Sequence, residues 1–198
     1  FFKALLFLSA GSIIHSMQDE QDMRKLGGLY YIMPFTYSTF IVGSLSLMGL
    51  PFLTGFYSKD VILELAYSSI TVGNIFSYWL GVIGAFFTSL YSIRLLYFTF
   101  LNKPNGPKVN YIKAHEGNWQ LVTPLYILGF LSIFAGYIFK DIYIGLGTDV
   151  WKNSLYIFPE NVTILNSEFV PFYIKLVPVF FSFTGILIII YINNYMSM

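Results

Sequence analysis

The sequence predicts an all-α polytopic membrane protein of about five transmembrane units, one of which is a discontinuous helix. Three observations support this fold class. Of the 198 residues, 56% are hydrophobic and 11% are charged, whereas a soluble domain carries about 25% charged residues. The charged residues fall mostly between apolar segments long enough to cross a bilayer. Within one of these segments, Gly49, Pro51 and Gly55 interrupt the helical pattern.

Residues 1–17 form the first unit, an apolar run that would measure about 25 Å as a helix. A bilayer core is about 30 Å thick, so we expect this run to be the second half of a transmembrane helix. The connection that follows, residues 18–33, contains a stretch too rich in charge to lie in lipid.

Residues 34–70 form the second unit, and they would reach about 55 Å as one unbroken helix, well beyond the bilayer core. We expect a first half from Pro34 to Gly49, a break across Pro51–Gly55, and a second half that resumes near Ser58. Non-helical backbone at membrane depth persists only where protein or a water-filled cavity satisfies its polar groups. A break of this kind therefore indicates an ion or proton path.

Three further spans complete the fold, namely 75–101, 119–139 and 171–193. The loop 102–118 is rich in Asn, Pro, Gly and Lys, and part of the connection 140–170, near 142–155, is expected to lie along the membrane interface. Loops 18–33 and 102–118 carry five Lys and Arg residues, whereas the opposite side carries two. The positive-inside rule therefore places the first side in the matrix or cytoplasm.

Composition also excludes several classes of function. The chain has no cysteine and only two histidines, so disulfides, thiolate clusters and a histidine metal site are not expected. No phosphate-binding loop or nucleophile motif is present, and a net charge of +1 argues against nucleic-acid binding. The abundant Phe, Tyr and Ile have A/T-rich codons, which favours an organelle genome.

Charged residues within or beside the apolar segments are the candidate site. Lys59 and Asp60 follow the helix break, and Asp60 is expected in the first turn of the resumed helix, where a carboxylate suits the positive end of the helix dipole. Glu64, four residues later, shares the face of Asp60. These three are candidate proton-transfer residues, because ionisable groups within transmembrane segments mark ion paths. Glu64 could equally lie in solvent.

Four other polar residues lie within or beside the apolar segments, and two of them allow two interpretations each. Lys3 lies within an apolar helix and either carries protons or extends to an interface. His15 could pass protons between the surface and the interior, or be an interfacial histidine without a role. Arg94 keeps its charge and suits a structural or tuning function. Lys175, one turn into the last helix, is expected to be an interfacial anchor.

Four ordered runs closely resemble a known family, namely residues 1–7, 11–15, 20–28 and 51–60. The family is mitochondrial NADH:ubiquinone oxidoreductase chain 5, the antiporter-like membrane subunit of respiratory complex I, over its C-terminal portion. The resemblance is strong over residues 1–101 and looser afterwards. It implies that 1–101 is the end of the second antiporter-like helix bundle, with broken helix 34–70, and that 102–198 holds the following transmembrane helices and loops.

The resemblance also implies roles and partners. Lys3 and Lys59 match the family's central lysines, Asp60 its acid linked to proton exit, and Arg94 its arginine on the next helix. The family's first bundle is absent here, so another chain or segment would carry it. The implied setting is the mitochondrial inner membrane, among membrane lipids and other membrane-arm subunits of complex I. NAD, FMN, iron–sulfur clusters and ubiquinone are expected on those other subunits, with no redox chemistry in this chain.

Three functions therefore remain open at this stage. The leading hypothesis is a proton-translocating membrane-arm segment of NADH:ubiquinone oxidoreductase, a translocase of the respiratory electron-transport chain. The second is a subunit of a multisubunit cation/proton antiporter, which couples proton flow to sodium without a redox enzyme. The third is a structural assembly fragment that has no proton path of its own.

Overall fold

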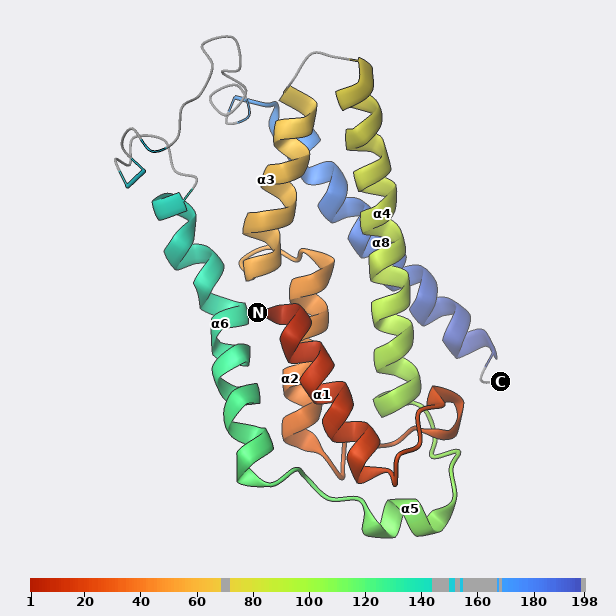
Figure 1. Ribbon diagram of the computed structural model, residues 1–198. Coiled ribbons are helices and arrows are strands. Elements are labelled where there is room, and N and C mark those ends of the chain that lie inside the picture. Colours follow the sequence, from red (N-terminus) through yellow and green to blue (C-terminus); the bar gives the residue numbers. More distant parts are fainter. Residues whose placement is uncertain (69–71, 144–149, 152–153, 155–166, 168, 197–198) are drawn as a thin grey trace.

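The computed structural model describes residues 1–68, 72–143, 150–151, 154, 167 and 169–196. Within these ranges the chain is helical (Figure 1). The helices are α1 (Phe2–Ser16), η1 (Met23–Lys25), α2 (Pro34–Met48), α3 (Thr54–Ser68), α4 (Val72–Leu96), η2 (Tyr97–Leu101), α5 (Lys108–Lys113), α6 (Trp119–Tyr143) and α8 (Phe172–Met196).

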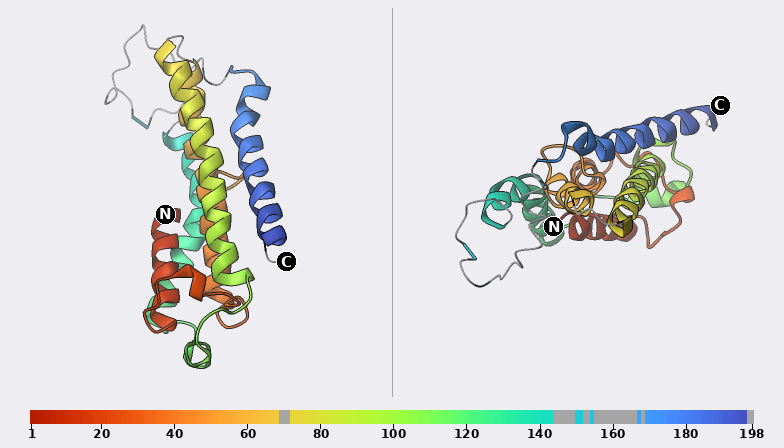
Figure 2. Two further views of the ribbon diagram at one scale, coloured as in Figure 1. Left: turned by 90° about the vertical axis from the view of Figure 1, so that its right-hand side faces the viewer. Right: turned by 90° about the horizontal axis from the view of Figure 1, so that it is seen from above.

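The long helices stand side by side in an alternating bundle (Figures 1 and 2). Helix α1 descends from the middle of the bundle to its lower end in Figure 1, α2 returns to the middle, and α3 continues to the upper end. Helices α4, α6 and α8 then run along the bundle in alternate directions. The most extensive packing joins α4 to α8, α1 to α2, and α3 to α6. This arrangement confirms the all-α polytopic fold.

Three helices of the described part are long and apolar enough to cross a membrane, namely Gly73–Leu101, Trp119–Tyr143 and Phe172–Asn193. Each coincides with an expected span, and α6 extends four residues beyond the expected end at Phe139. Helix α1 is a shorter apolar helix. Of the interfacial segment expected at 142–155, the first two residues complete α6, and most of the others lie outside the described residues.

The two loops that were expected on the same side of the membrane do lie together. The Asn105 side chain donates to the Arg24 carbonyl at 2.9 Å, and that of Asn110 donates to the Met17 carbonyl at 3.3 Å. The Glu116 carboxylate accepts from the Phe35 amide at 2.7 Å. An acid suits this position, because the first amides of a helix have no partner within the helix. Which compartment this end faces stays a prediction.

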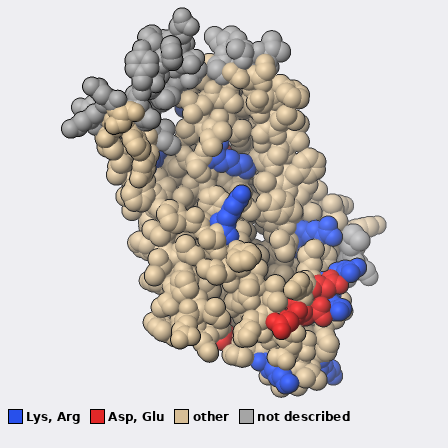
Figure 3. All heavy atoms as spheres, in the orientation of Figure 1, with Lys and Arg blue, Asp and Glu red and all other residues tan. Residues whose placement is uncertain are grey.

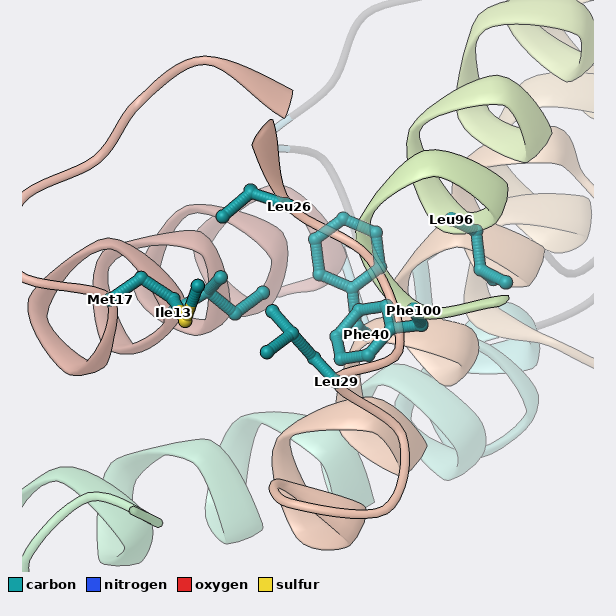
Figure 4. Packing of buried hydrophobic residues seen from close by; sticks show 7 residues of the cluster. All are labelled: Ile13, Met17, Leu26, Leu29, Phe40, Leu96 and Phe100. Carbon is teal, nitrogen blue, oxygen red and sulfur yellow. The ribbon is translucent and has the colours of Figure 1, made fainter. Parts of the chain in front are cut away.

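A buried apolar cluster stabilises the same end of the bundle (Figure 4). It joins α1, α2, the connection between them, and the end of α4 with η2. Its members are Ile13, Met17, Leu26, Leu29, Phe40, Leu96 and Phe100. Charged groups of both signs gather toward the lower end of the face in Figure 3, whereas the face above shows a few basic groups among uncharged residues. The bundle therefore has a charged rim at the end that holds η1 and α5.

Candidate functional site

The helix break is shorter than the sequence predicts. Gly49 ends α2 in the left-handed conformation, with φ of 80°, which glycine adopts without a Cβ penalty. The chain then turns through Phe52, whose φ of 72° is also left-handed. Helix α3 begins at Thr54, and not near Ser58. Pro51 therefore lies within the break, whereas Gly55 does not.

A serine of α2 explains the early start of α3. The Ser46 hydroxyl accepts from the Gly55 amide at 3.2 Å, and so satisfies a first-turn amide that has no helical partner. Gly55 permits this approach, because a Cβ there would overlap the Ser46 carbonyl oxygen. Gly55, which was expected to break the helix, is thus a point of contact between its two halves.

Helix α6 supports the break from the side. The Thr54 hydroxyl donates to the Leu131 carbonyl at 3.0 Å and accepts from the Gly136 amide at 3.0 Å. Both groups belong to α6 and lie five residues apart. The start of α3 is therefore fixed against one particular turn of α6.

Lys59 satisfies a carbonyl that the break exposes. Its ammonium donates to the Met48 carbonyl at 3.3 Å and to the Thr88 hydroxyl of α4 at 3.4 Å. Ser182 of α8 also reaches the Met48 carbonyl, at 3.3 Å. Lys59 thus joins the end of α2 to α3 and α4, and α8 meets them at the same carbonyl.

Asp60 lies beside the same break and is 5% exposed. Its Oδ2 atom is buried and makes no hydrogen bond to any residue that the structure describes. Its Oδ1 atom lies 4.0 Å from the position that a Cβ on Gly49 would take. Lys59 and Asp60 are the sixth and seventh residues of α3. They occupy its second turn, which corrects the expectation that Asp60 lies in the first turn and weakens the argument from the helix dipole.

Glu64 does not stand alone in solvent. Its carboxylate forms an ion pair with the Lys175 ammonium of α8 at 3.4 Å, and both side chains are largely buried. Sequence reasoning missed this pairing, because the two residues lie 111 positions apart and no local pattern links them. Lys175 is therefore more than an interfacial anchor.

Lys3 and His15 occupy a different surface from the break. Both are exposed in this chain, and they share one face of α1 with Phe7 and Gly11 at four-residue spacing. Leu5, from the opposite side, is fully buried. Lys3 makes no hydrogen bond or ion pair with Lys59 or Asp60 in the described chain. The place of Lys3 in the row of lysines that the family resemblance implies stays a prediction.

His15 and Arg94 lie near the charged end of the bundle. His15 lines a cavity of about 40 Å³, together with Ser12 of the same helix and His115 of the loop before α6. Two histidines 100 positions apart thus meet in space, which the sequence did not predict. The exposed Arg94 guanidinium lies over the Phe98 ring, 5.8 Å from its centroid. Among the described residues, no cluster of three or more His, Asp or Glu side chains could hold a metal ion.

Comparisons with known proteins identify the family. Residues 1–88 match the model for the transmembrane domain described as NADH:quinone oxidoreductase/Mrp antiporter, and residues 91–150 match the model for the NADH dehydrogenase subunit 5 C-terminus. Over 94% of its length, the chain is 57% identical to NADH-ubiquinone oxidoreductase chain 5 of Phytophthora infestans. The chain belongs to the NADH dehydrogenase subunit 5 family.

Other members of the subunit 5 family show the same coverage. The protein of the same name from Marchantia polymorpha is 57% identical over 93% of this chain, and that from Arabidopsis thaliana is 52% identical over 98%. This chain spans 28% of the length of the Phytophthora and Marchantia relatives. Membership in this family, with the helical architecture, makes the chain a multi-pass protein of the mitochondrial inner membrane.

Proposed function

We propose that this chain is a proton-translocating segment of the membrane arm of NADH:ubiquinone oxidoreductase. The observation that carries the proposal is the helix break halfway along the bundle, where the Lys59 ammonium binds the Met48 carbonyl beside the buried Asp60 carboxylate (Figure 1). Intramembrane ionisable groups are costly, and they persist where a path for ions or protons needs them. The names of the relatives support the choice of enzyme.

Lys59 and Asp60 would exchange the proton at the break. A lysine ammonium has three N–H donors, and Met48 and Thr88 use two of them. The third is available to a neighbouring acceptor, and the Asp60 Oδ2 atom has no hydrogen-bond partner in the described chain. Loss of a proton by Lys59 and gain of one by Asp60 would carry charge past the break without moving the backbone.

Lys3 and His15 would contribute from the exposed face of α1. We propose that this face meets the other antiporter-like bundle, carried by another chain or segment, and that protons reach Lys59 through that contact. Membrane lipids and further membrane-arm subunits would cover the remaining apolar surface. NADH oxidation and ubiquinone reduction, with FMN and the iron–sulfur clusters, would take place on other subunits.

A cation/proton antiporter is the second candidate. The description of the family model that matches residues 1–88 includes Mrp antiporters, and this observation favours the antiporter as a candidate. The two functions differ in their energy source, because only the first couples transport to NADH oxidation. Sodium-dependent proton flux without NADH would support the antiporter.

Replacing Lys59 by alanine tests the proposed function. Proton pumping per NADH oxidised is measured in inner-membrane vesicles, with assembly of the complex checked on native gels. We expect an assembled complex whose coupled turnover falls by 10-fold or more, since the exchange at the break is lost. The matched control is Lys140→Ala, which removes an exposed lysine near the end of α6. Normal pumping by Lys59→Ala would overturn the proposal.

A further inference from the structure

Helix α8 presents one polar side chain toward α3 and another toward the end of α2. Lys175 and Ser182 lie seven residues apart, which is two helical turns, and so they share a face. Lys175 pairs with Glu64 at 3.4 Å. Ser182 reaches the Met48 carbonyl that also binds Lys59. This face of α8 therefore follows α3 from its middle down to the break (Figure 2 shows α8 beside the bundle).

A tyrosine of α4 fixes the part of α8 that carries Lys175. The Tyr78 hydroxyl donates to the Ile174 carbonyl at 3.1 Å, and Tyr78 is 3% exposed. This carbonyl is free to accept, because its helical partner four residues later would be Pro178, which has no amide hydrogen. The backbone immediately before Lys175 is thus held by a buried hydrogen bond.

The groups between the break and the Glu64–Lys175 pair form a short series. Asp60 and Glu64 are four residues apart on one face of α3, which places their Cβ atoms about 6 Å apart. Asp60 is almost fully buried and has an oxygen without a partner in the described chain, whereas Glu64 is paired. The ionisable groups that surround them are Lys59, Tyr67, Tyr78 and Lys175.

We propose that Lys175 controls the second step of the proton path. This inference rests on the proposed function, and it extends the path from the break onto α8. The Asp60 carboxyl gives its proton to an intervening water, and the water gives a different proton to a Glu64 oxygen. Two O–H bonds break and two form, and the water is regenerated. The protonated Glu64 releases Lys175. When Glu64 loses the proton toward the end of the bundle that holds the N-terminus of α8, the ion pair forms again. Lys175 is a positioning residue, because it acts through the charge of Glu64.

Variants of Lys175 in the assembled complex test this inference. We expect Lys175→Met to lower proton pumping per NADH by about 5-fold or more. We expect Lys175→Arg to retain most of the pumping, because arginine keeps the positive charge. The exchanged pair Glu64→Lys with Lys175→Glu should recover part of the activity that each single change loses. A structural role without charge would not distinguish methionine from arginine in this way.

Two results would overturn the inference. One is normal pumping by Lys175→Met, and the other is an equal loss in the methionine and arginine variants. If the complex does not assemble with Lys175→Met, Glu64→Gln takes its place, since glutamine keeps the shape of the side chain. Normal pumping by Glu64→Gln would likewise overturn the inference. The Lys59→Ala result separates the two proposals. Loss in Lys59→Ala with normal Lys175→Met ends this inference alone, whereas normal Lys59→Ala ends the proposed function.

Discussion

Two prolines within the helix bundle have opposite effects in this molecule. Pro51 lies in a break where α2 ends and α3 begins, whereas Pro178 lies inside α8, which continues without interruption. At Pro178, the Tyr78 hydroxyl replaces the missing amide donor of the helix. At Pro51, the preceding Gly49 turns left-handed, and Lys59 and Ser182 reach the freed Met48 carbonyl.

This comparison indicates that a proline alone does not decide whether a helix breaks. Proline removes one amide and crowds the carbonyl four residues earlier. A neighbour that supplies one hydroxyl is enough to repair that loss, as at Pro178. A break also needs a residue that can leave the helical conformation and several polar groups to satisfy the exposed backbone. Only the region after Met48 combines these features among the described helices.

The largest expected effect comes from closing the space inside the break. Gly55→Ala places a methyl group on the Ser46 carbonyl oxygen. Overpacking of this kind costs about 1–3 kcal/mol, and more where backbone cannot shift. We expect a lower midpoint of thermal unfolding of the complex in detergent and less assembled subunit. Gly84→Ala is the control, since nothing lies within 4 Å of its Cβ position. An equal effect of both variants would show that the contact with Ser46 is unimportant.

A smaller effect is expected at the repaired proline. Tyr78→Phe leaves the buried Ile174 carbonyl without its donor, which costs about 1–2 kcal/mol. The double variant Tyr78→Phe with Pro178→Ala tests the explanation, because alanine restores an amide to the helix. We expect the loss of thermal stability caused by Tyr78→Phe to be smaller in the Pro178→Ala background. Equal losses in the two backgrounds would mean that the hydroxyl does not replace the proline amide. Tyr91→Phe, at an exposed tyrosine, is the control.

The smallest effect is expected outside the membrane, at a charge pair that sharpens the contrast with Asp60. Hydrogen bonds from the Arg24 side chain and amide lower the pKa of the partly exposed Asp22 to about 2. A lowered pKa in the folded state means that the contribution is present above the unfolded pKa, near 4, and is lost as pH falls through about 2. We expect hydrogen exchange at the Arg24 amide to be unchanged from pH 7 to pH 5, once corrected for the intrinsic rate, and protection to fall toward pH 2. Asp22→Asn should remove this pH dependence.

The sequence predicts the fold well, because apolar length and turn chemistry are local properties. The spans 75–101, 119–139 and 171–193 are all present, and the break was expected at Pro51. The start of α3 was wrong by four residues, because a serine of the preceding helix supplies the acceptor for the Gly55 amide. A contact between the two halves of a broken helix leaves no mark on local propensity.

The candidate site was predictable only in part, for the same physical reason. Lys59 and Asp60 were identified from their place beside the break, and the structure does bring them to it. Partners on distant helices were not predictable, as with Lys175 for Glu64 and Ser182 for the Met48 carbonyl. Lys3 lies on an exposed face of α1, and its place on the same path stays a prediction. Which face of an apolar helix turns inward is decided by packing when nearly every position is apolar.

The Thr54 hydroxyl has a mechanical consequence. It holds two backbone groups of α6 at once, the Leu131 carbonyl and the Gly136 amide. Sliding α3 along α6 by a single residue, about 1.5 Å, would separate it from both. These two hydrogen bonds therefore fix the register of the start of α3 against α6. If the bundle changes shape during turnover, the movement belongs on the opposite side of α3, where α4 and α8 meet the charged residues.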